Sequence, residues 1–291
     1  MITVTPLNSW AVLSTSILIN WEGAAILVDI GPGTVTKLVE KGLSTSSLQG
    51  ILVSHSHIDH FWDLVPLLWL RHLRNQRKRL KIICPRSDVP LMEWCTKVSQ
   101  TDHPVEICGL EAGGETRLGK LVVKSFSANH ETSKQPLGFT ITEEPKKKLA
   151  TEELTRLGVP KEAWRKLLRG KVPPNLPGEL SDYVYQRQRR VVYAGDSRPT
   201  KELLGNAEKA DLLIVESTYA DDRARGDALR SDHMTVGEAL DLALSAKVKN
   251  ALLTHFSMRY SVKAFQESVK EFVRRHPEAP KVFMGEKVFT V

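Results

Sequence analysis

The chain has 291 residues, of which 41% are hydrophobic and 26% are charged, and these fractions are those of an ordinary soluble protein with a substantial core. The N-terminus has no basic region before an apolar core, and the most apolar window, residues 61–70, is too short to span a bilayer, so neither a signal peptide nor a membrane segment is expected. The cysteines Cys84, Cys95 and Cys108 form no Cys-x-x-Cys pair, which predicts reduced thiols in a cytoplasmic protein.

The formal charge of +7 is unevenly distributed along the chain. Residues 71–81 contain six basic side chains and no acidic one, and residues 143–190 carry a net charge of +5. The remainder is therefore slightly acidic. Clustered positive charge on such a body indicates a polyanionic partner, although each cluster alone is also consistent with a solvated helix face.

The first 30 residues are predicted to form strands, of which residues 16–19 and 25–30 are the clearest. Glycine and proline at 31–33 end the second of these strands, and a helix is expected to follow through Glu40. Asp29 lies at the end of the buried run, where a turn carboxylate is the simplest interpretation.

Four strong ligand side chains, His55, His57, Asp59 and His60, follow the apolar run 51–53. If the strand continued through them, its alternation would point His55, His57 and Asp59 to one face, and a turn could bring His60 to the same point. Neutral imidazoles and a carboxylate suit zinc and related divalent metals. The alternative interpretation is a histidine-rich loop that binds no metal.

Helices and strands alternate after this motif. Helices are expected at residues 61–78 and 88–99, and strands at 80–84, 106–108 and 121–126. Asp88 is placed as an N-cap of the second helix. His130 follows the last of these strands, and we favour a metal ligand over a core histidine because the metal site lacks a ligand.

The composition changes after a strand at residues 138–142. Residues 146–188 are rich in Lys, Arg, Pro and Gly and contain short helical patterns at 151–157 and 161–169. This composition predicts an insertion that projects from the main body and adds little core. We define residues 143–190 as the basic arm.

The second half again alternates strands and helices. Strands are expected at 190–194, 212–215 and 251–254, and helices at 199–210, 235–248 and 262–275. The strands deliver Asp196, Glu216 and His255 at their ends, where the Asp196 carboxylate could bridge two metals. Because no low-complexity linker interrupts this pattern, we expect one α/β domain over residues 1–291 with the basic arm inserted.

The His-x-His-x-Asp-His spacing of residues 55–60 resembles the signature of the metallo-β-lactamase superfamily. The resemblance implies an αββα sandwich of two mixed β-sheets flanked by helices, with two Zn²⁺ ions, or Mn²⁺ or Fe²⁺ instead. It assigns His55, His57 and His130 to one metal and Asp59, His60 and His255 to the other, with Asp196 between them. It also implies that Asp29 supports the ligand loop through hydrogen bonds.

Residues 216–219, 232–235 and 253–260 resemble ribonuclease Z, the endonuclease family that processes tRNA 3′ ends. The resemblance implies that Glu216 and His233 form a proton-donating pair beside the catalytic Asp59. It places Arg259 and Ser257 at the substrate phosphate and precursor tRNA as the partner. The candidate RNA-binding residues of the arm are Lys146, Lys147, Lys148, Arg165, Lys166 and Arg169.

The sequence also departs from this family, because Thr5-Pro6-Leu7-Asn8 replaces its usual Phe-Leu-Gly-Thr pattern and the arm is shortened. Several alternatives therefore stay open for the substrate: another RNA, single-stranded DNA or a small phosphodiester. A thioester or lactone hydrolase would have no need of His233, Arg259 or the arm. A nucleic-acid-binding protein without turnover would be free to lose metal ligands. A homodimer is a further expectation that the sequence leaves open.

Overall fold

The computed structural model describes residues 1–130, 134–172 and 176–291. Contacts along the chain divide it into two compact units. The first unit comprises Met1–Ile141 and Arg190–Val291, and the second comprises Thr142–Arg189. Each unit is described by itself.

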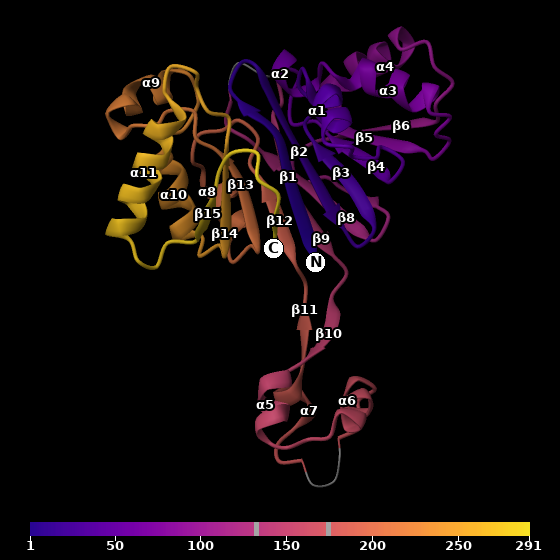
Figure 1. Ribbon diagram of the computed structural model, residues 1–291, viewed down its shortest axis with the longest axis vertical. Coiled ribbons are helices and arrows are strands. Elements are labelled where there is room, and N and C mark those ends of the chain that lie inside the picture. Colours follow the sequence, from indigo (N-terminus) through magenta and orange to yellow (C-terminus); the bar gives the residue numbers. More distant parts are fainter. Residues whose placement is uncertain (131–133, 173–175) are drawn as a thin grey trace. The chain divides into compact units, whose positions relative to one another are not determined.

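Two sheets of seven strands each form the centre of the first unit, as far as the described residues show (Figure 1). The first sheet has the order β16 (Phe289–Thr290), β1 (Ile2–Trp10), β2 (Ser14–Trp21), β3 (Ala24–Val28), β4 (Leu48–Leu52), β5 (Leu80–Pro85) and β6 (Val105–Leu110). The second has the order β15 (Lys281–Phe283), β14 (Asn250–Thr254), β13 (Leu212–Glu216), β12 (Arg190–Tyr193), β9 (Leu137–Glu143), β8 (Leu121–Ser127) and β7 (Glu115–Leu118).

Both sheets are mixed. In the first, β1, β2 and β3 pair antiparallel, whereas β3 to β6 pair parallel. In the second, β12 to β15 are parallel, and β7 pairs antiparallel with β8. The predicted sandwich of two mixed sheets flanked by helices is therefore confirmed.

Helices cover the outer face of each sheet (Figure 1). On the first sheet these are α1 (Thr34–Glu40), α3 (Leu64–Leu73) and α4 (Val89–Val98). On the second they are α8 (Lys201–Ala207), α10 (Val236–Ser245) and α11 (Val262–Arg275). Shorter helices lie in the connections: α2 (Ile58–Phe61), the 3₁₀ turns Arg86–Asp88 and Asp222–Ala224, and α9 (Arg225–Arg230).

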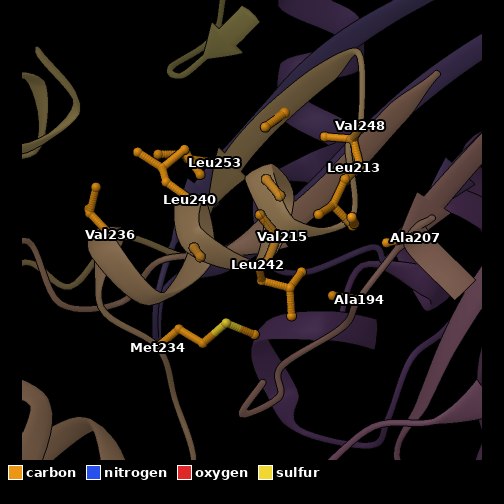
Figure 2. Packing of buried hydrophobic residues seen from close by; sticks show 14 of the residues in the cluster. Ala194, Ala207, Leu213, Val215, Met234, Val236, Leu240, Leu242, Val248 and Leu253 are labelled. Carbon is orange, nitrogen blue, oxygen red and sulfur yellow. The ribbon is translucent and has the colours of Figure 1, made fainter. Parts of the chain in front are cut away.

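Strand β13 shows why its apolar run is continuous. Leu212 and Ile214 point into the core between the sheets, whereas Leu213 and Val215 pack against the helices. Figure 2 shows Leu213 beside Val248, in the same buried cluster as Val215 and Leu240 of α10. Complete burial of such a side chain contributes roughly 1.5–3 kcal/mol, so both faces of the sheet stabilise this architecture.

The prediction of one helix over residues 61–78 is wrong in its length. The chain forms α2 and α3 instead, because the Asp63 backbone N–H donates to the Ile30 carbonyl at 3.0 Å and the Asp63 carboxylate accepts from Val35 at 2.8 Å. Helix α3 ends at Leu73. Arg71 is fully buried, so it does not belong to the exposed basic cluster expected there.

The second unit contains the strands β10 (Lys146–Leu149) and β11 (Val184–Arg187), which pair antiparallel, and the helices α5 (Thr151–Arg156), α6 (Lys161–Leu168) and α7 (Leu180–Tyr183). Contrary to the prediction from composition, it has a small core of its own, in which Leu154, Leu167 and Tyr183 are buried. Pro173 and Pro174, which belong to the predicted arm, lie outside the described residues.

No helix within residues 1–130, 134–172 and 176–291 is long and apolar enough to cross a membrane.

Candidate metal centre and active site

The histidine motif does not continue the strand, so the predicted alternation is wrong. Strand β4 ends at Leu52, His55 and His57 lie in the following loop, and Asp59 and His60 belong to α2. The physical reason is a contact over 25 residues: the Ser54 backbone N–H donates to Asp29 Oδ1 at 2.8 Å instead of continuing the sheet. The loop still brings its ligands together, because His55 Nε2 lies 3.0 Å from His57 Nδ1.

Asp29 supports the loop as expected. Its carboxylate accepts from the Ser54 hydroxyl at 2.9 Å, lies 2.7 Å from His60 Nδ1 and accepts from the Tyr193 hydroxyl. Asp29 itself adopts a φ of 54°, a conformation that is costly for a residue with a side chain. Its role is therefore to orient the loop and the His60 ring.

The structure brings all seven predicted metal ligands to one place. The ligand atoms of His55, His57 and His130 lie within 4.8 Å of one another, and so do those of Asp59, His60 and His255. Asp196 Oδ2 lies 3.2 Å from His60 Nε2, 3.1 Å from His255 Nε2 and 3.8 Å from His55 Nε2. One carboxylate oxygen therefore faces ligands of both groups.

These residues fit metal ions. Among the residues that the structure describes, the buried Nε2 atoms of His60 and His255 have no hydrogen-bond partner, although each lies close to Asp196. Their Nδ1 atoms are held by Asp29 and by the Thr218 hydroxyl, the latter at 2.9 Å. This arrangement is typical of metal-binding histidines, in which a bond at one ring nitrogen directs the other at the ion.

Electrostatics also favour cations at this place. Burial opposes the charged form of Asp196, but the neighbouring His255 and His60 outweigh it and hold the pKa of Asp196 well below its usual range. Burial, with His60 adding to it, lowers the pKa of His55 well below 6.5. Asp196 thus offers an ionised carboxylate and His55 a neutral imidazole, the forms that bind metals. At His60 burial acts in the same direction, but the facing Asp196 and Asp29 outweigh it and raise its pKa well above 6.5.

Beside the centre, Glu216 and His233 form the predicted pair. His233 Nδ1 lies 2.9 Å from Glu216 Oε1, and the His233 ring centroid is 4.9 Å from that of His255. Burial lowers the pKa of His233, but the facing Glu216 carboxylate outweighs it and raises the pKa to about 9. His233 can therefore hold a proton next to the metal-binding groups.

Glu216 is held in place by several donors. Its carboxylate accepts from the backbone N–H groups of Ser197 and Met234 at 2.9 and 3.0 Å and from the Thr218 hydroxyl at 2.7 Å. Thr218 also contacts His255 Nδ1, so it links the Glu216–His233 pair to the metal-binding groups. The sequence prediction gave Thr218 no role in the site. Thr218 lies two residues after Glu216, the last residue of β13, and this position could have indicated that it is close to the site.

Arg198 is a second residue that the sequence prediction missed. Its guanidinium donates to the His233 carbonyl and, through both Nη atoms, to Glu238 at 2.7 and 2.5 Å. Its backbone N–H donates to the Asn129 carbonyl at 3.0 Å, beside His130. Arg198 therefore holds the backbone at His233 and at Asn129 in place. Its position two residues after Asp196 could have indicated that it lies near the site.

The predicted phosphate-binding residues follow His255. The Ser257 backbone N–H donates to the Thr218 carbonyl at 3.0 Å, and Arg259 has an exposed side chain. The predicted RNA-binding residues lie in the second unit. Lys147, Lys148, Arg165, Lys166 and Arg169 are exposed there, whereas Lys146 is half-buried and lies 3.3 Å from Glu143.

Comparisons with known proteins identify the family of this chain. A family model described as a β-lactamase superfamily domain matches residues 25–150 and 167–256. The metallo-β-lactamase fold protein YhfI from Bacillus subtilis superposes with a TM-score of 0.71 at 19% identity, with all of both chains covered. Human tRNase Z, short form, superposes with a TM-score of 0.69 at 21% identity, with 99% of each chain covered. The fold and site thus define a metallo-β-lactamase superfamily protein.

A more similar relative narrows the class. A protein named Ribonuclease Z from Gemmatimonas aurantiaca is 35% identical over 257 residues, which span 85% of this chain and 81% of that relative. The chain belongs to the ribonuclease Z family.

Proposed function

We propose that this chain is a zinc-dependent endoribonuclease that hydrolyses the phosphodiester at the 3′ trailer of precursor tRNA. The observation that carries the proposal is the Glu216–His233 pair beside two groups of metal-binding side chains. A phosphodiesterase needs a proton donor when a ribose oxygen departs, whereas a thioester hydrolase releases a thiol that needs little protonation. The relatives named Ribonuclease Z support the same conclusion.

Seven side chains would hold two zinc ions. His55, His57 and His130 would hold one, Asp59, His60 and His255 the other, and Asp196 would contact both. Bound zinc would polarise a phosphoryl oxygen and lower the pKa of a coordinated water. Mn²⁺ or Fe²⁺ could replace zinc, because imidazole and carboxylate ligands accept these ions as well.

The protein's own residues supply the proton balance. Hydrolysis joins a water oxygen to phosphorus, with one proton of that water passing to the solvent, and breaks the bond between phosphorus and the ribose oxygen. His233, charged and held by Glu216 through Nδ1, donates the proton on its other ring nitrogen to the departing oxygen. Arg259, which is exposed on the loop after His255, would bind a non-bridging phosphate oxygen.

The test compares four substrates with the zinc-loaded protein. We expect cleavage of labelled precursor tRNA at its 3′ trailer to exceed cleavage of a generic single-stranded RNA, slower hydrolysis of bis-p-nitrophenyl phosphate, and no hydrolysis of a thioester. Equal rates on both RNAs would leave a phosphodiesterase and reject the tRNA substrate. Faster hydrolysis of the thioester would reject the proposed reaction class.

A further inference from the structure

Four large apolar side chains are exposed next to the metal-binding groups. Val12 is 78% exposed, Leu13 50%, Ile58 54% and Met258 58%. They come from the turn between β1 and β2, from α2 and from the loop after His255. We call these four residues the apolar rim.

Hydrogen bonds attach the rim to the site. The Val12 backbone N–H donates to Asp59 Oδ2 at 3.1 Å, and this oxygen lies 3.5 Å from both His60 Nε2 and His255 Nε2. In Figure 1 the turn between β1 and β2 lies beside α2, at one end of the sandwich. Ile58 directly precedes Asp59 in α2. The turn and α2 therefore border one face of the centre.

The loop after His255 is tied to the same turn. The Ala11 backbone N–H donates to the Phe256 carbonyl at 3.0 Å, and the Phe256 N–H donates to the Ser9 carbonyl at 2.8 Å. Met258 lies two residues beyond Phe256. The loop that carries Met258 is thus bonded to the strand end that leads into Val12 and Leu13.

The backbone of Val12 gives an independent indication of function. Val12 has a φ of 67°, a conformation that is unusual for a β-branched residue. Such strain is kept where surrounding contacts enforce it, and it is concentrated at functional sites. Here it accompanies the bond from the backbone N–H of this exposed valine to a metal-binding carboxylate.

We propose that the apolar rim is a subsite for an unpaired nucleobase that flanks the scissile phosphodiester. This inference rests on the proposed function, because a phosphodiester at the metal centre places the adjoining nucleotide at its border. The rim offers apolar surface without charge, so it suits the face of a base and not a phosphate. A base inside a duplex is stacked on both faces, whereas an unpaired base can leave the stack and pack against apolar side chains.

The test uses two small phosphodiesters with the same leaving group. Thymidine 5′-(p-nitrophenyl phosphate) carries a base, and methyl p-nitrophenyl phosphate does not. We expect kcat/KM to be about tenfold higher for the thymidine diester, the order expected when one apolar side chain is buried against a base. In Leu13→Ser/Met258→Ser this preference should fall about five- to tenfold, with hydrolysis of the methyl diester unchanged, because neither residue holds a metal-binding group.

Matched controls lie elsewhere on the surface. Val39→Ser and Leu229→Ser change side chains that are 50% and 64% exposed and should leave the preference intact. A second measurement needs no turnover: the affinity of a labelled five-nucleotide RNA should fall about five- to tenfold in the rim variant and not in the controls.

Three outcomes would overturn the subsite: no preference for the thymidine diester in the parent protein, an unchanged preference in the rim variant, or unchanged RNA affinity. If the rim variant instead turns a dimer into a monomer and keeps the preference, the rim binds a second copy and the inference is wrong. The protein could also fail to cut precursor tRNA and still show a base preference that depends on the rim. That result would reject tRNA as the substrate and support the subsite.

Discussion

Asp196 has an unusual position among the ligands, because one of its oxygens lies within 3.8 Å of three imidazoles from both metal-binding groups. Removing its carboxylate would leave two cations facing each other without a negative charge between them. Asp196→Ala should therefore lose at least one of two zinc ions and reduce turnover about a hundredfold or more.

Metal analysis of the purified protein checks this prediction, with Asp102→Ala as the control. Asp102 is an exposed carboxylate that pairs with His72 and Arg77. The control should keep its zinc. Undiminished zinc in Asp196→Ala would show that this carboxylate does not bridge metals.

His233 allows proton donation to be separated from metal binding. His233→Ala should lower turnover of an RNA substrate about 10²- to 10⁴-fold, because the ribose oxygen then departs without a proton. Zinc content and RNA affinity should change little. The loss should shrink on bis-p-nitrophenyl phosphate, whose leaving group needs little protonation. Equal losses on both substrates would indicate a structural role for His233.

Arg71 shows how a charged residue can connect elements instead of binding a ligand. Buried in α3, its guanidinium donates to His103 Nε2 at 2.6 Å and to the carbonyls of Thr45 and Lys78. His103 Nδ1 lies 3.1 Å from the Pro104 carbonyl, so Nδ1 carries the proton and Nε2 accepts. Three loops are joined in this way to one helix.

This network predicts a dependence of stability on pH. Burial, and next the Arg71 charge, hold the pKa of His103 below its ordinary value of 6.5. As the pH falls below about 6.5, the unfolded chain therefore takes up a proton before the folded protein does, and stability is lost. His103→Gln keeps an acceptor for Arg71 and does not titrate. Its melting temperature should fall less between pH 7.5 and pH 5.5 than that of the parent protein, and identical slopes would contradict the prediction.

The strands and the ligands at their ends could be predicted because each apolar run is local in sequence. The carboxyl ends of β12, β13 and β14 meet at one sheet edge, which explains why Asp196, Glu216 and His255 come together. The local shape of the histidine motif could not be predicted, because the bond from Ser54 to Asp29 that ends β4 spans 25 residues. The break before α3 has the same cause, since Asp63 bonds to Ile30.

The core of the second unit also could not be predicted from the sequence. Leu154, Leu167 and Tyr183 come from three separate helices, and nothing in their local spacing indicates that they meet. The prediction that this segment adds little core rested on its content of charged residues and proline. It did not account for the few apolar residues, which are enough to form a small core.

The second unit carries a net positive charge, which suits binding to a polyanion. We propose that this unit binds the body of tRNA. None of its described residues belongs to the three hydrophobic clusters of the first unit. Replacing residues 143–189 by a short loop should therefore change the melting temperature of the first unit little. Hydrolysis of bis-p-nitrophenyl phosphate should survive.

The loss should instead be seen in RNA binding. Each Lys or Arg that contacts a phosphate releases counterions, which adds about 0.7–0.9 to the slope of log affinity against log salt. The deletion should weaken precursor-tRNA binding and flatten this slope. Arg165→Ala/Lys166→Ala/Arg169→Ala should reproduce part of the effect and reduce the slope by up to about 3.

A control with the same change in charge separates contact from net charge. Lys263, Lys270 and Arg274 are exposed on α11 of the first unit. Their triple alanine variant also removes three positive charges, so an effect of net charge alone would weaken binding equally in both triple variants. If the second unit contacts RNA, only Arg165→Ala/Lys166→Ala/Arg169→Ala should flatten the salt slope. A deletion that leaves tRNA affinity and its salt slope unchanged would show that this unit is not the RNA-binding arm.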